Sequence, residues 1–195
     1  MSIARDSVVQ SPERPLAGRR EAQPFLDSAG VLLASGDTNS AVALLNRASA
    51  LVQARAGQPR GAAGDALLAV SDSIDRYAGA LARREPSGAS PLARLSVLLN
   101  LAEADRHLAL ASVACSTRSR ESVYDELTMA IDHVERASRD GSFPRRASRR
   151  AAVAEARRAA APLATDCAQD LASLDDAIAS LRREVDEMRR TLVTQ

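Results

Sequence analysis

The sequence has 195 residues with a formal net charge of +1, and 46% of its residues are hydrophobic but only 2% are aromatic. This length favours a single domain, and no apolar run approaches the roughly 20 residues that cross a bilayer. Because Leu, Val, Ile and Ala supply almost all the apolar surface and β-branched runs are scarce, the composition predicts an all-α protein.

The first twenty residues contain Pro12, Pro15 and Gly18 without a helical period, and we predict a flexible tail over 1–20. They also lack the apolar stretch of a secretory signal. All 26 basic residues are arginines, a bias typical of GC-rich genomes. We therefore expect a cytoplasmic bacterial protein.

From residue 22 onward the apolar spacing is helical almost throughout. This spacing predicts antiparallel helical hairpins that form a bundle of about seven helices. The first five predicted helices cover residues 22–35, 38–55, 65–84, 91–115 and 120–140.

Start and stop signals bound these helices. Gly36 and Gly141 end the first and the fifth, and a Gly- and Pro-rich loop over 56–64 separates the second from the third. Ser90 followed by Pro91 is a strong start signal for the fourth helix. That helix is apolar around much of its circumference, so we expect it at the centre of the bundle.

The stretch SGDTNSAVALLNRASALV resembles the second half of a tetratricopeptide repeat. The turn, small and large positions of that family fall on Gly36, Asp37, Ala41, Leu45 and Ala48. The resemblance covers one hairpin, residues 22–56, and does not recur at a period near 34. It implies a packed helical hairpin rather than a peptide-binding stack, which needs about three repeats.

Residues 143–195 form the last predicted part of the chain, after a bundle over 21–142. Pro144 opens a basic helix, and Pro162 kinks or breaks it. Apolar residues then follow in a heptad pattern, at Leu171, Leu174, Ile178, Leu181, Val185, Met188 and Leu192. A helix of about 30 residues would be about 45 Å long, so we expect part of it to project. Either its own domain or a second chain must cover this seam.

Residues 136–160 contain eight arginines against Asp140 and Glu155, a local net charge of +6. The candidates for anion binding are Arg145, Arg146, Arg149, Arg150 and Arg157. The simpler interpretation places the basic helix beside acidic helices, with salt bridges at the rim. Binding of a phosphate backbone or an acidic partner is the alternative. The nearly neutral chain and its scarce aromatics disfavour nucleic acid.

Glu103 and His107 lie one helical turn apart, and His133 is roughly level with them on the next antiparallel helix. Together with Glu126 they are candidate metal ligands. The simpler interpretation is a pair of half-exposed histidines on the bundle surface, since the di-iron Glu-x-x-His pattern is absent.

The sequence contains no Gly-rich phosphate loop, no G-x-S-x-G and no Cys with a plausible histidine base. We therefore expect a non-enzyme without cofactors. The leading hypothesis is a scaffold protein that pairs with itself or a partner through the heptad helix. The alternatives are an anion or nucleic-acid binder that uses the arginine helix, and a metal-dependent helical enzyme.

Overall fold

The computed structural model describes residues 21–57, 61–85, 90–141, 143–144, 147–165 and 171–193. In these residues the chain is all-α and has no strand, which confirms the predicted fold class. The elements are α1 (Gln23–Ala34), α2 (Thr38–Ala56), α3 (Ala62–Ala82), α4 (Ser90–Ser116), α5 (Arg120–Asp140), α6 (Ala147–Ala160), the 3-10 helix η1 (Ala161–Thr165) and α7 (Leu171–Val193).

The turn between α1 and α2 forms as the sequence predicts. Gly36 has a φ of +84°, a conformation that glycine adopts without steric cost. This geometry lets the Asp37 backbone N–H reach back to the carbonyl of Leu32, at 2.9 Å. The Asp37 side chain then caps α2 by accepting a hydrogen bond from the backbone N–H of Ser40. The two helices therefore run antiparallel as a hairpin.

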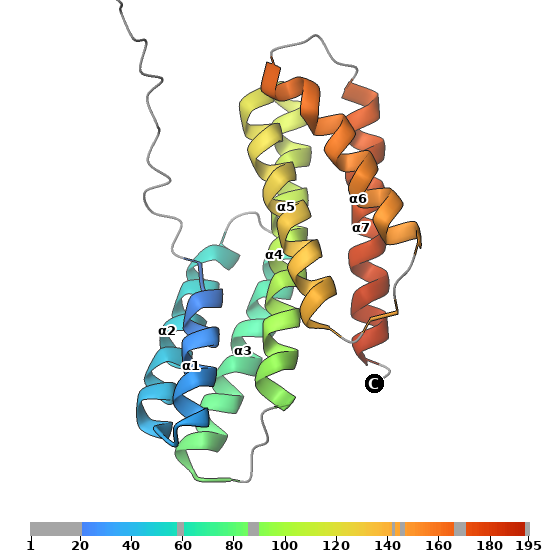
Figure 1. Ribbon diagram of the computed structural model, residues 1–195. Coiled ribbons are helices and arrows are strands. Elements are labelled where there is room, and N and C mark those ends of the chain that lie inside the picture. Colours follow the sequence, from blue (N-terminus) through green and yellow to red (C-terminus); the bar gives the residue numbers. More distant parts are fainter. Residues whose placement is uncertain are drawn as a thin grey trace, which may run out of the picture.

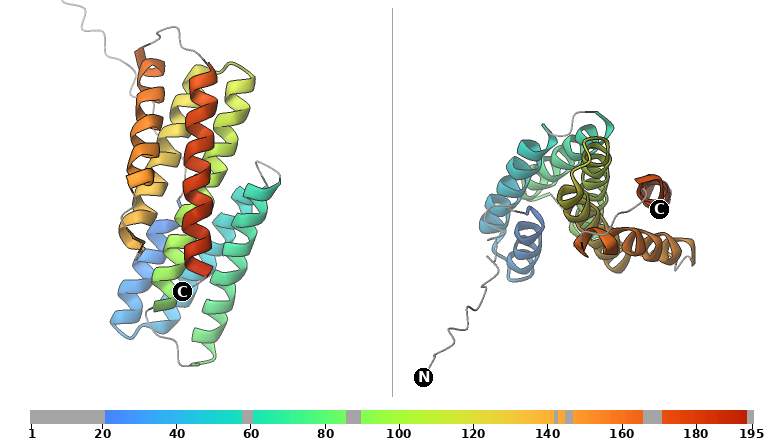
Figure 2. Two further views of the ribbon diagram at one scale, coloured as in Figure 1. Left: turned by 90° about the vertical axis from the view of Figure 1, so that its right-hand side faces the viewer. Right: turned by 90° about the horizontal axis from the view of Figure 1, so that it is seen from above.

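α4 is the helix that joins the two halves of the fold (Figures 1 and 2). On one side it packs against α1 and α3, and on the other against α5 and α7. One hydrophobic core lies among α1, α2, α3 and α4, and a second lies among α4, α5, α6, η1 and α7. Leu98 of α4 contacts both cores. The predicted central position of this helix is therefore observed.

The second core contains residues from both parts of the predicted division, 21–142 and 143–195. α6 begins at Ala147 rather than at Pro144, and residues 145–146 lie outside the described residues. Pro162 lies within η1, so the helix ends near the proline as predicted. None of the described helices is long and apolar enough to cross a membrane.

The expectation that the C-terminal helix projects is wrong. α7 lies along the bundle, and its seam is covered by the chain's own helices (Figure 2). The seam residues with described side chains are all buried, namely Leu174, Ile178, Leu181, Val185, Met188 and Leu192; the side chain of Leu171 lies outside the described residues. A heptad repeat specifies an apolar stripe, and in this protein the stripe is buried against helices of the same chain.

Three polar contacts also hold α7 against α4. Arg189 pairs with Asp105 and donates to the carbonyl of Leu101, while Arg94 donates to the carbonyl of Leu192 at 2.8 Å. Burial raises the pKa of the Asp105 carboxyl, and the neighbouring Arg189 guanidinium opposes this effect.

Replacing Leu181 with alanine tests whether the seam belongs to the core. Leu181 is completely buried, so we expect Leu181→Ala to lower the free energy of unfolding by about 2–5 kcal/mol. Arg183→Ala, on the exposed face of the same helix, should change it by less than about 0.5 kcal/mol. Denaturant titration followed by circular dichroism measures both values. Equal effects would mean that α7 is not packed on the bundle in solution.

Candidate metal centre

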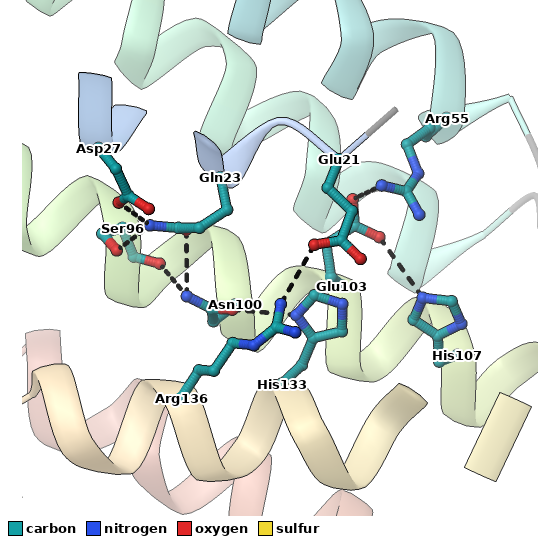
Figure 3. A network of polar contacts seen from close by, with 10 residues as sticks. All are labelled: Glu21, Gln23, Asp27, Arg55, Ser96, Asn100, Glu103, His107, His133 and Arg136. Carbon is teal, nitrogen blue, oxygen red and sulfur yellow. Dashed lines mark hydrogen bonds and ion pairs between the residues drawn. The ribbon is translucent and has the colours of Figure 1, made fainter. Parts of the chain in front are cut away.

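A group of polar side chains is buried where α4 and α5 meet α1 and α2 (Figure 3). α4 supplies Asn100, Glu103 and His107, and α5 supplies His133. Their exposed fractions are only 0–2%. We call these four residues the polar cluster. Burying so many polar groups destabilises the folded state unless each group has a hydrogen-bond partner.

The helical repeat explains why these side chains meet. Asn100, Glu103 and His107 are three and four residues apart, so they project from one face of α4. His133 projects from the antiparallel α5 at the same level, and its ring stacks on His107 with 5.4 Å between the ring centroids. The predicted alignment of the two histidines is therefore observed. The interpretation as half-exposed surface histidines is wrong, because both rings are buried in the contact between the helices.

The protonation of the His133 ring is determined by a chain of amide hydrogen bonds. Asn100 Nδ2 donates to the backbone carbonyl of Ser96 at 3.0 Å, which can only accept. Asn100 Oδ1 therefore faces the ring, 2.9 Å from His133 Nδ1. Since that oxygen only accepts, Nδ1 must carry the proton, and Nε2 carries a lone pair.

Gln23 supports this assignment from α1. Its Nε2 donates to the carboxylate of Asp27 and to the hydroxyl of Ser96, both at 2.7 Å. Its Oε1 consequently accepts from Asn100 Nδ2 at 3.2 Å. Both amides are thus oriented independently of the histidine.

His107 is oriented in the same way by a carboxylate. Its Nδ1 lies 2.5 Å from Oε2 of Glu126, on α5. With the Nδ1 proton directed to that oxygen, Nε2 is the nitrogen that carries the lone pair of His107 when the ring is neutral. Neither Nε2 atom has a hydrogen-bond partner among the described residues. The two rings therefore each present an unused, buried nitrogen donor.

Glu103 is the acidic member of the polar cluster. Its Oε1 lies 2.9 Å from the Nη1 atom of Arg55 on α2, and its Oε2 lies 4.0 Å from His107 Nε2. Burial raises the pKa of this carboxyl, while the nearby Arg55 and His107 lower it. Burial, together with His107 and three arginines, lowers the pKa of His133 to about 3. His133 is consequently neutral at physiological pH, as a metal ligand must be.

One donor atom from each of Glu103, His107 and His133 lies within 4.8 Å of the others. Ligand atoms that bind one zinc ion tetrahedrally at about 2.0–2.2 Å are about 3.3–3.6 Å apart, so side-chain shifts of about 1 Å would bring all three into range. The partners at the far side of each ring match metal sites, where the second histidine nitrogen usually donates to a carboxylate or carbonyl. Sequence reasoning found the three donors and Glu126 but missed Asn100, Gln23 and Arg55.

The arginine candidates do not form one surface. Arg149 is buried, lies 3.9 Å from Glu184 of α7 and packs over the ring of Phe143. Arg157 is exposed and forms a 2.8 Å ion pair with Glu135 of α5. Arg150 is exposed, and Arg145 and Arg146 lie outside the described residues. Pairing of this helix with acidic neighbours, the simpler interpretation, thus occurs at two of the three described positions.

Comparison with known proteins identifies no relative: no protein-family model, no curated protein and no solved structure matches the chain. Any assignment of function must therefore come from the polar cluster and the surface.

The tautomers in the polar cluster can be measured directly. Two-bond ¹H–¹⁵N correlation spectra of metal-free protein, recorded at a pH where both rings are neutral, should show Nδ1–H and a bare Nε2 for both histidines. Asn100→Leu removes the acceptor of His133 alone, so we expect loss of that single tautomer and about 1–3 kcal/mol of stability. The His107 pattern should persist in this variant and serves as the internal control. An Nε2–H signal in the wild type would contradict the assignment.

Proposed function

We propose that this protein binds a divalent transition-metal ion through Glu103, His107 and His133. The observation that carries the proposal is the orientation of the two rings. Each histidine has its Nδ1 occupied by a fixed acceptor and leaves a buried Nε2 without a hydrogen bond among the described residues, and one donor atom of each ring lies within 4.8 Å of the Glu103 carboxylate. Such a donor set suits a cation better than it suits any hydrogen bond within the chain.

The donor types restrict which ions fit. Two imidazole nitrogens and one carboxylate favour Zn²⁺, Fe²⁺ or Mn²⁺. Ca²⁺ and Mg²⁺ prefer sites made only of oxygens, and Cu⁺ prefers sulfur ligands. We therefore expect zinc, iron or manganese, with zinc as the most convenient probe.

Glu103 can bind a metal ion although the positively charged Arg55 is its neighbour. Arg55 lies at Oε1 of Glu103, whereas Oε2 is the oxygen nearer to His107. Glu103 can thus keep its ion pair with Arg55 and still offer one oxygen to a metal. Carboxylate ligands in metal sites are commonly held by such a partner.

The scaffold hypothesis rested on a heptad seam in need of a partner. The buried seam of α7 needs none, so pairing through this helix is a weaker explanation than metal binding.

Titration calorimetry with Zn²⁺ on chelator-treated protein tests the proposal. We expect one ion per chain, with binding lost in Glu103→Gln and in His133→Ala. Glu126→Gln, which disturbs only the orientation of His107, should weaken affinity by about 10–100-fold. Asp125→Asn changes an exposed neighbouring acid and should bind zinc like the wild type.

Thermal unfolding gives a second measure, because a ligand that binds only the folded chain stabilises it. At a free zinc concentration of 1,000 times the dissociation constant, the gain is about 4 kcal/mol. Glu103→Gln preserves the shape of the side chain, so its own fold can be checked before zinc is added. If the wild type binds none of the three metals, or if Glu103→Gln binds as tightly, the proposal is wrong.

A further inference from the structure

A groove with a volume of about 530 Å³ lies between α5 and α6, on a different face of α5 from His133. α5 contributes Glu135, Ser138 and Arg139, and α6 contributes Arg149, Arg150, Val153, Ala154 and Arg157. We call this site the arginine groove. Its volume falls in the range of small-molecule sites, about 300–1,000 Å³.

Two of its four arginines are already matched with acids of the same chain. Arg157 pairs with Glu135 at 2.8 Å, and Arg149 lies 3.9 Å from Glu184 while packing over Phe143. Glu135, the one acid among the lining residues, is therefore paired with Arg157, and Glu184 lies near Arg149, the most buried of the four arginines. The remaining two arginines are Arg139 and Arg150.

Arg139 and Arg150 are both exposed and come from different helices to the same groove. No ion pair or hydrogen bond of either guanidinium is found among the described residues. The acids nearest to them in the sequence, Asp140 and Glu155, do not line the groove. The groove therefore presents the positive charges of four arginines against the single carboxylate of Glu135 at physiological pH, because arginine stays protonated in proteins.

The rest of the lining is less polar. Val153 is half-buried, and Ala154 lies beside it on α6. A ligand that fits would thus carry about two negative charges at one end and a small apolar body at the other. A phosphate monoester has a charge of about −1.5 to −2 at pH 7, and guanidinium groups bind its oxygens in pairs.

We infer that the arginine groove binds a small organic phosphate monoester, held between Arg139 of α5 and Arg150 of α6. This site shares no residue with the proposed metal centre and does not depend on it. Glu103→Gln should consequently bind an organic phosphate as the wild type does, so that failure of either proposal leaves the other standing.

Calorimetric titration with phenyl phosphate, inorganic phosphate and phenol tests the inference. Phenyl phosphate should bind more tightly than inorganic phosphate, and phenol should not bind measurably. Arg139→Gln and Arg150→Gln should each weaken phenyl phosphate binding by about 10–100-fold, the loss expected for a charged hydrogen bond. Both positions are exposed, and circular dichroism can verify that the variants fold.

Arg158→Gln is the matched control, because Arg158 is exposed on α6 but does not line the groove. It should bind phenyl phosphate like the wild type. Equal weakening by Arg158→Gln would show attraction by net charge alone and would overturn the inference. Inorganic phosphate binding as tightly as phenyl phosphate, or phthalate binding as tightly as either, would also overturn it.

Discussion

α4 must bury apolar side chains on opposite faces at once, and the other helices are arranged to meet that requirement. Leu95, Leu99 and Ala102 lie in the core shared with α1–α3, whereas Leu101 and Leu108 lie in the core shared with α5–α7. Burial of apolar area contributes roughly 25 cal/mol per Å², so exposing either face would be costly for a chain of marginal stability. Neither group of helices is dispensable to α4.

The same helix carries three of the four residues of the polar cluster, namely Asn100, Glu103 and His107. The buried polar residues of this helix have no access to water, so each of them must find a partner in the protein. Asn100 does so through Gln23, Ser96 and His133. The two Nε2 atoms and Glu103 are the part of this network that the protein's own hydrogen bonds leave incomplete, and they lie together. Apolar side chains at these positions would avoid this cost.

The helices and their ends could be predicted because they depend on local signals. The Gly36–Asp37 turn and the i, i+4 spacing of Glu103 and His107 are properties of a few neighbouring residues. The cover of the α7 seam could not be predicted, since a heptad stripe is the same whether its partner is α4 or another chain. The partners of Asn100 could not be predicted either: Gln23 is 77 positions and His133 is 33 positions away in the sequence, and only the tertiary fold brings these side chains into contact.

The amides between Asp27 and His133 also have a direction. The ring N–H donates to Asn100, the Asn100 amide donates to Gln23, and Gln23 donates to the carboxylate of Asp27, which is exposed on α1. Dipoles aligned head to tail polarise one another. Three hydrogen bonds in series thus connect the surface carboxylate of Asp27 to the buried ring of His133. A side chain that water reaches and one that it does not reach are in this way parts of a single polarised chain.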